Sequence, residues 1–339
     1  MNGRSGWRGP AARAIIGAAS LMLCLVMTLA AVGCGSGSGS ERSGGKLKIV
    51  ATVFPAFDWA REIVGEGNDG VELTFLLDHG VDLHSYQPTA FDVASIKSCD
   101  VFIYVGGESE KWVENTLKAA PNESRTVIDL LDVLGEHAKE EETVEGMECE
   151  EKDEEEEEGV EYDEHVWLSL KNAALFCESI CQALCAADPA NADGYKANAE
   201  AYVEKLTKLD GEYEAAVEAA PVKTLVFGDR FPFRYLTDDY GITYYAAFVG
   251  CSTETEASFK TVVFLAGKVD ELGLGSIMRI ETSDGSIART IRDNTKSKDQ
   301  KILILDSLQS KTGDDVRNGT SYLSVMEQNL SALKEALKK

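Results

Sequence analysis

Residues 46–55 read KLKIVATVFP, a short and mostly apolar run that ends at a proline. The run is typical of a buried strand over Lys46 to Phe54, and Pro55 ends it. Helix-like spacing follows over 56–64, and the chain continues with strands predicted over 71–77, 101–105 and 127–130 and a short helix over 91–98. Strands that alternate with helices and are apolar almost throughout favour a parallel sheet covered on both faces.

The second half of the chain repeats this pattern after two helices, predicted over 172–187 and 190–219. The second helix contains no proline after its start and stops at Pro221. At about 1.5 Å per residue it is long enough to run the length of a two-lobed protein. Strands follow over 224–227, 243–248, 276–280 and 301–305, with helices over 233–240, 259–272, 287–295 and 322–337. About 295 residues lie beyond the first 44, more than one compact core usually takes, so two lobes are expected.

The first 45 residues are typical of an export signal. A basic start precedes residues 14–32, which carry no charge, and small residues then lead to Cys34. This pattern predicts a lipoprotein signal peptide over 1–33, lipidation of Cys34, and a flexible Gly/Ser-rich tether over 34–45. The alternative is an uncleaved membrane anchor, because the apolar stretch is near the length of a membrane span. Either reading places the remainder of the chain outside the cytoplasm.

The formal net charge is −25, and 17 carboxylates against two lysines lie within residues 136–164. This balance argues against nucleic-acid binding, which needs a basic surface. The acid run is expected to be a solvated loop without structure of its own, because crowded carboxylates repel one another. Its field would concentrate cations near the histidine that follows it, an effect that salt weakens.

Three of the eight cysteines, Cys177, Cys181 and Cys185, repeat every four residues and so share one face of a helix. They are expected to be small buried side chains. A thiolate metal site is the alternative, although the spacing matches no usual zinc pattern. No disulfide is predicted for the scattered cysteines, Cys99, Cys149 and Cys251.

Two of the four histidines lie where a metal ligand is expected. His165 follows the acid run directly and opens the apolar segment 165–168, and His84 lies in the loop 80–88 after a predicted strand. His79 and His137 are expected to be solvated. In open α/β sheets, ligands bind beyond the carboxyl ends of the strands, so residues in such loops are the first candidates for a site.

Carboxylates from the second half of the chain follow predicted strands in the same way. Asp229 comes after the strand 224–227, and Glu281 and Asp284 come after the strand 276–280. Asp229 could instead cap the following helix or pair with Arg230. One of Glu281 and Asp284 could support the other without binding the ion itself. An ion bound by imidazoles of the first half and carboxylates of the second would hold the two lobes together.

These segments resemble a known family. TVFP (52–55), GVDLHSYQP (80–88), GGESEKW (106–112) and HVWL (165–168) occur in the order seen in zinc and manganese receptors, the solute-binding proteins of ABC importers. DPANA (188–192) and GCSTETEAS (250–258) match as well. The resemblance runs from about residue 46 to the C-terminus.

The resemblance implies an α/β fold in which two lobes of parallel sheet, flanked by helices, are joined by one long rigid helix, with the metal between the lobes. The boundaries expected are an N-terminal α/β lobe over 46–188 that contains the acidic loop 136–164, a connecting helix over 189–220, and a C-terminal α/β lobe over 221–339.

The chain departs from the family pattern in two places. Its loop before the second histidine ligand is acidic and almost free of histidine, and no histidine follows His165. An ungapped match of 228–235 places Arg230, which cannot bind a cation, at the third ligand position. One inserted residue places Asp229 there instead, which resembles the carboxylate of manganese members. The fourth ligand of the family falls at Glu281 or Asp284.

The sequence therefore predicts a non-enzymatic receptor on the outside of a bacterial cell membrane, held there by its lipid anchor and monomeric. It would bind a divalent transition metal, zinc first and manganese next, and deliver the ion to an ABC permease and its ATPase. One alternative is a zinc-dependent hydrolase, although the His-Glu-x-x-His pattern is absent. Another is an acidic calcium-buffering or adhesion lipoprotein.

Overall fold

The computed structural model describes residues 45–147, 161–252 and 256–338, which belong to one compact unit. The predicted signal peptide, Cys34 and most of the tether lie outside the described residues, as do Cys149 and residues 148–160 of the acid run. Within the described part of the chain, no helix is both long and apolar enough to cross a bilayer.

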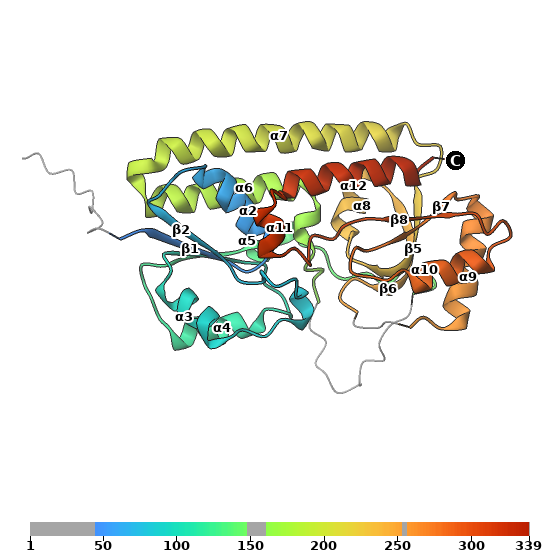
Figure 1. The fold of residues 1–339 in the computed structure, drawn as a ribbon, viewed down its shortest axis with the longest axis horizontal. Coiled ribbons are helices and arrows are strands. Elements are labelled where there is room, and N and C mark those ends of the chain that lie inside the picture. Colours follow the sequence, from blue (N-terminus) through green and yellow to red (C-terminus); the bar gives the residue numbers. More distant parts are fainter. Residues whose placement is uncertain (1–44, 148–160, 253–255, 339) are drawn as a thin grey trace, which may run out of the picture. The chain divides into compact units, whose positions relative to one another are not determined.

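The first half of the unit is built on a parallel sheet with the strand order β2-β1-β3-β4 (Figure 1). Its strands are β1 (Leu47–Ala51), β2 (Val71–Phe75), β3 (Val101–Tyr104) and β4 (Thr126–Asp129). Its helices are α2 (Phe54–Val64), α3 (Ala90–Ser98), α4 (Lys111–Ala119), α5 (Leu130–Leu134) and α6 (Leu170–Ala187). The central strands β1 and β3 are almost entirely buried, as expected for strands covered on both faces.

The second half repeats this topology in a parallel sheet of order β6-β5-β7-β8. Its strands are β5 (Thr224–Phe231), β6 (Thr243–Val249), β7 (Ser276–Arg279) and β8 (Lys301–Ile304). Its helices are α8 (Arg234–Tyr240), α9 (Phe259–Leu272), α10 (Ser286–Asn294), α11 (Gly313–Arg317) and α12 (Tyr322–Ala336). The prediction of two parallel α/β sheets flanked by helices is confirmed.

The long helix α7 (Ala192–Glu218) follows a short 3₁₀ turn at Pro189–Asn191 and packs against α6, α2 and α12. Figure 1 shows it running past the helices of both sheets. Its buried face repeats at helical spacing and consists of Tyr195, Ala199, Tyr202, Leu206, Leu209, Tyr213 and Val217. Because one continuous helix packs on both halves, it joins them without a flexible linker.

The C-terminal segment returns to the first half of the molecule. The backbone N–H of Tyr322 donates to Asp58 Oδ2 at 2.7 Å, and the Tyr322 hydroxyl donates to the backbone oxygen of Trp167 at 2.7 Å. Gly313 N also donates to Asp78 O at 2.7 Å. The segment that contains α11 and α12 therefore fastens the two halves together, and α12 packs beside α7. No local sequence pattern predicted this connection.

Two predicted strand boundaries were wrong, and three helices were missed. Phe54 opens α2 instead of ending β1, because Pro55 is tolerated in the first helical turn, where its missing N–H is not needed. The strand predicted over 224–227 is longer than expected: β5 continues to Phe231 with a register shift between Phe227 and Arg230, because Arg230 and Phe231 pair with the end of β6. Helices α4, α5 and α11 were not predicted.

The acid run is not wholly without structure. Its first residues form an isolated antiparallel bridge with its last ones. They also contact the second half: Lys139 Nζ lies 2.8 Å from Asp238 Oδ2, and Arg234 Nη1 donates to Glu142 Oε2 at 2.8 Å. The expectation of a solvated loop without structure of its own is therefore wrong for residues 139–142, because Lys139 and Glu142 are paired with charged side chains of the second half.

Candidate metal centre

His84 is presented by a short 3₁₀ helix, Leu83–Ser85, which begins after Asp82. Asp82 Oδ1 accepts a hydrogen bond from His84 N at 3.0 Å and so caps this turn. The apolar neighbour Leu83 is buried and anchors the turn in the core, whereas the His84 side chain keeps 6% of its surface exposed. This arrangement aims the imidazole into the space between the two halves.

His165 immediately precedes the 3₁₀ helix Val166–Leu168, whose three residues are fully buried. The acids before it are buried as well: Asp163 is 2% exposed and Glu164 is 1% exposed. These two carboxylates close the acid run in the sequence but are not part of a solvated strip. Buried charges need partners, so both carboxylates are expected to be hydrogen-bonded within the protein.

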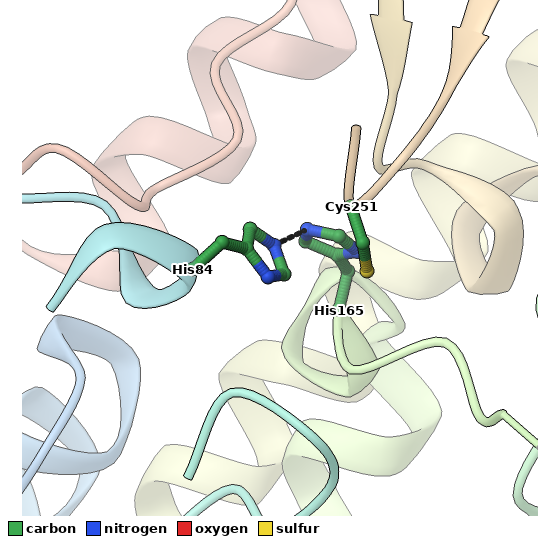
Figure 2. Close-up of side chains that lie close together, drawn as sticks. All are labelled: His84, His165 and Cys251. Atoms are coloured by element: carbon green, nitrogen blue, oxygen red, sulfur yellow. Dashed lines mark hydrogen bonds between the residues drawn. The ribbon is translucent and has the colours of Figure 1, made fainter. Parts of the chain in front are cut away.

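The two imidazoles meet through their Nε2 atoms, which lie 3.2 Å apart (Figure 2). Each Nδ1 faces oxygen: His165 Nδ1 lies 3.0 Å from Asp163 Oδ1, and His84 Nδ1 lies 2.8 Å from Ser109 Oγ and 3.4 Å from Glu164 Oε2. Asp163 can only accept from His165 Nδ1, whereas the Ser109 hydroxyl can either donate to His84 Nδ1 or accept from it. The His165 proton on Nδ1 leaves its Nε2 as a lone pair, which can accept from His84 Nε2 or bind a cation.

Glu164 remains a carboxylate in this environment. Burial alone would raise its pKa, but hydrogen bonds from His84 and Ser109 lower the pKa below its usual value. Ser109 N donates to Glu164 Oε1 at 2.8 Å. The chain can approach this closely because Gly107, with a φ of +80°, has no Cβ, and a Cβ there would lie 2.4 Å from Glu164 Oε1.

Cys251 completes a cluster with the two histidines. The ligand atoms of these three residues all lie within 4.8 Å of one another, and in Figure 2 the sulfur lies beside the His165 ring. Gly250 permits this approach, because a Cβ there would lie 3.1 Å from His165 Cε1. Burial and the carboxylates of Glu141, Asp163 and Glu164 raise the pKa of the Cys251 thiol, so it becomes a thiolate only when a cation displaces its proton.

The predicted carboxylates lie outside this three-residue cluster. Asp229 is 9% exposed, and its oxygens accept from Arg230 N at 3.0 Å and from Ile280 N at 3.3 Å, which connects β5 to the end of β7. Burial raises the pKa of its carboxyl. Asp284 has a side chain that is 76% exposed and accepts from Ser286 N at the start of α10. Both residues line a cavity of about 470 Å³ beside His84.

Glu281 lies under a loop of the second half. Its carboxylate accepts from Ser307 N at 2.8 Å, Ser307 Oγ at 2.9 Å and Ser310 Oγ at 3.0 Å. Burial and the neighbouring Asp306 raise the pKa of Glu281. In this structure Glu281 organises the loop 307–310.

Arg230 also lines the cavity and forms an ion pair with Asp82 from the other half. Burial works against ionisation of Asp82, yet Arg230 and His84 hold its pKa below the usual value. Arg230, which the ungapped match placed at the third ligand position, therefore contacts Asp82, the carboxylate that caps the turn carrying His84.

Of the residues that the structure describes, the other histidines and the cysteines of the repeat are not part of the three-residue cluster. The His79 side chain is 87% exposed, and His137 is exposed, as predicted. Cys177 and Cys181 are buried in the core between α6 and its neighbours, which agrees with the apolar reading of the cysteine repeat. Cys251 was missed as a ligand although it lies in the segment 250–258, which matched the family.

The family model for ZnuA, described as zinc-uptake complex component A periplasmic, matches residues 49–336. The chain belongs to this family. It is 32% identical over 317 residues to the zinc-binding lipoprotein AdcA of Streptococcus pneumoniae strain R6, covering 93% of this chain and 60% of that protein. It is 28% identical over 330 residues to the manganese ABC transporter substrate-binding lipoprotein PsaA of Streptococcus anginosus, covering 94% and 98%.

A solved structure of the Zn(II)-bound ZnuA-like domain of S. pneumoniae AdcA has the same fold as this family member. The TM-score is 0.68 and the identity 30%, with 87% of this chain and 100% of that chain covered. This chain spans 56–60% of the length of the AdcA proteins that it matches in sequence.

Proposed function

We propose that this protein is an extracytoplasmic receptor that binds a divalent transition metal between its two lobes and delivers it to an ABC importer, with zinc favoured over manganese. One observation carries the proposal: two largely buried imidazoles, each with its Nδ1 beside oxygen atoms, bring their Nε2 atoms within 3.2 Å of each other. Membership of the ZnuA family supports it.

The donor set favours zinc. His84, His165 and Cys251 supply two imidazole nitrogens and one sulfur, and thiolate is a soft ligand that selects zinc over the harder manganese ion. The relatives' names are consistent with this choice, since AdcA is named as zinc-binding and PsaA as a manganese receptor. Carboxylates at Asp229, Glu281 or Asp284 remain part of the proposal as ligands recruited when the ion is bound.

The mechanism is binding without bond chemistry. The ion exchanges bound water for the imidazole nitrogens and the sulfur, the thiol proton of Cys251 leaves, and Asp163 and Glu164 offset the charge through the two rings. A monomeric receptor held at the outer face of the membrane by lipid on Cys34 would then dock on a permease that an ATPase drives. Residues 46–188, 189–220 and 221–339 would act as the first lobe, the connector and the second lobe.

Titration calorimetry of the demetallated protein with Zn²⁺ and with Mn²⁺ tests the proposal. One zinc ion per chain should bind, more tightly than manganese, and His84→Ala and His165→Ala should each abolish tight binding. His79→Ala is the matched control, because its side chain is 87% exposed. Stoichiometric zinc binding by a folded His84→Ala/His165→Ala double variant would overturn the proposed site, and tighter manganese binding would overturn the metal preference.

A further inference from the structure

Two cysteines of the four-residue repeat lie together on α6. Cys181 and Cys185 are one helical turn apart, and their Sγ atoms lie 3.9 Å from each other. Cys181 is 8% exposed and Cys185 is partly exposed, whereas Cys177, one turn earlier, is fully buried. Neither Cys181 nor Cys185 belongs to the three-residue cluster of the candidate metal centre or lines the cavity beside it. The pair is therefore a separate feature of the molecule.

Helix geometry works against a disulfide between these two thiols. Cβ atoms four residues apart on a helix are about 5–6 Å apart, whereas a disulfide needs about 3.5–4.5 Å. Forming the bond would require α6 to unwind locally, although this helix packs against α7, α2 and β4. The two sulfurs therefore remain free thiols that lie close together.

The same separation suits two ligands of one metal ion. Thiolates that bind an ion through bonds of about 2.3 Å lie about 3.8 Å apart at the tetrahedral angle, and the measured separation is 3.9 Å. Either thiol can donate a hydrogen bond to the other, and Cys185 can also donate to the backbone oxygen of Ala192 at 3.5 Å. A cation that binds between the sulfurs displaces these thiol protons, which pass to solvent.

A cavity of about 310 Å³ between α6 and α7 gives access to Cys181. Glu178 and Glu200 line this cavity and attract cations, and Lys196 lines it as well. Burial and the neighbouring Cys185 raise the pKa of the Cys181 thiol to about 11, whereas the positive charge of Lys196 acts to lower it. Lys196 would therefore offset the negative charge of two thiolates that share one monovalent ion.

From this geometry we propose that Cys181 and Cys185 form a second metal site, which binds a soft monovalent cation such as Cu(I) between their sulfurs. Thiolate ligands select soft ions. Zinc at a structural site takes four ligands, and among the described residues no third histidine, cysteine or carboxylate lies within 4.8 Å of both sulfurs. Cu(I) is stable with two sulfur ligands, so the pair alone is sufficient. The proposal is independent of the function proposed for the candidate metal centre.

Competition for Cu(I) against the chelator bicinchoninate, in ascorbate and without oxygen, tests the proposal. Every variant keeps the other cysteines, so each comparison reports only the altered thiol. Cys185→Ser should hold about one Cu(I) ion per chain fewer than the unaltered protein, and Cys181→Ser should lose the same ion. Cys177→Ser is the matched control, because this fully buried thiol belongs to the same repeat, and it should lose none. The zinc Kd should be unchanged in all three variants.

The proposal is overturned if Cys185→Ser keeps its full Cu(I) content. It is also overturned if Cys177→Ser loses as much Cu(I) as the other two variants, because a general effect on the helix would then explain the loss. A disulfide between Cys181 and Cys185 in the purified protein, detected by mass spectrometry as two thiols that are alkylated only after reduction, would overturn it as well. Cys185→Ser alters a partly exposed side chain, so it tests the site even where Cys181→Ser fails to fold.

Discussion

Asp163 is expected to contribute to metal affinity through His165 without contacting the ion. Its Oδ1 accepts from both His165 N at 2.8 Å and His165 Nδ1 at 3.0 Å. Asp163→Asn keeps the shape and an acceptor oxygen but removes the charge. We expect the variant to fold and to bind zinc more weakly, because the ring is less basic and the ion's charge is less well offset.

The magnitude follows from the geometry. The Asp163 oxygen is 3.0 Å from Nδ1, and crossing the ring and one zinc–nitrogen bond places the ion about 7 Å away. A single negative charge at that distance from Zn²⁺ contributes about 5 kcal/mol at an effective dielectric constant of 20. This is an upper limit, since nearby charges and solvent rearrange. The expected loss is about 10- to 100-fold in Kd, or about 1.4–2.7 kcal/mol.

The assay is zinc competition at fixed ionic strength, with Asp239→Asn as the control. Asp239 is a largely buried aspartate that accepts from Ser169 Oγ at 2.5 Å and does not line the cavity. An unchanged zinc Kd in Asp163→Asn would refute the reasoning that the carboxylate acts through the ring. Equal losses in both aspartate variants would refute it too, because a general effect on folding would then explain the result.

Three more outcomes are expected. Cys251→Ser should weaken zinc binding by at least about tenfold and remove the near-ultraviolet sulfur-to-metal band of the Co²⁺ form, whereas Cys185→Ser should change neither; a retained band would exclude Cys251 as a ligand. Glu110 is 2% exposed, and burial raises its pKa to about 8. Folding therefore takes up a proton between pH 4.5 and 8. The free energy of unfolding should fall as the pH rises through this window, by on the order of 5 kcal/mol at most, and it should fall less in Glu110→Gln. Denaturant titrations at pH 5, 6.5 and 8 measure the difference, and parallel curves would contradict it. Deleting residues 148–160 should leave the zinc Kd within about threefold and slow zinc association only at low salt; loss of the tight site would favour the calcium-buffering alternative.

Much of the site could be found from the sequence because its firmest members lie in local patterns. His84 and His165 each stand in a loop or turn bounded by recognisable segments, and the structure places their Nε2 atoms 3.2 Å apart. Asp163 and Glu164 were harder to interpret, since in sequence they are the last two of 17 acids. Only burial distinguishes them from the charges beside them.

Cys251 could not be found in the same way. It reaches His165 from the second half of the chain. It has no spacing in the sequence that relates it to His84. Its approach depends on the close contact allowed by Gly250, which is a property of packing.

The sequence by itself determined the alternation of strands and helices, the long α7 helix and the two histidines, because each depends on neighbours within a turn or a strand. Only the tertiary structure decided which oxygens lie beside the two imidazoles, and that a thiol from the second half stands within reach of both rings. It also decided that Glu281 supports a loop and that Arg230 pairs with Asp82. Those contacts join residues far apart in the chain. The distances in space between such residues are set only when the two halves pack along α7 and α12.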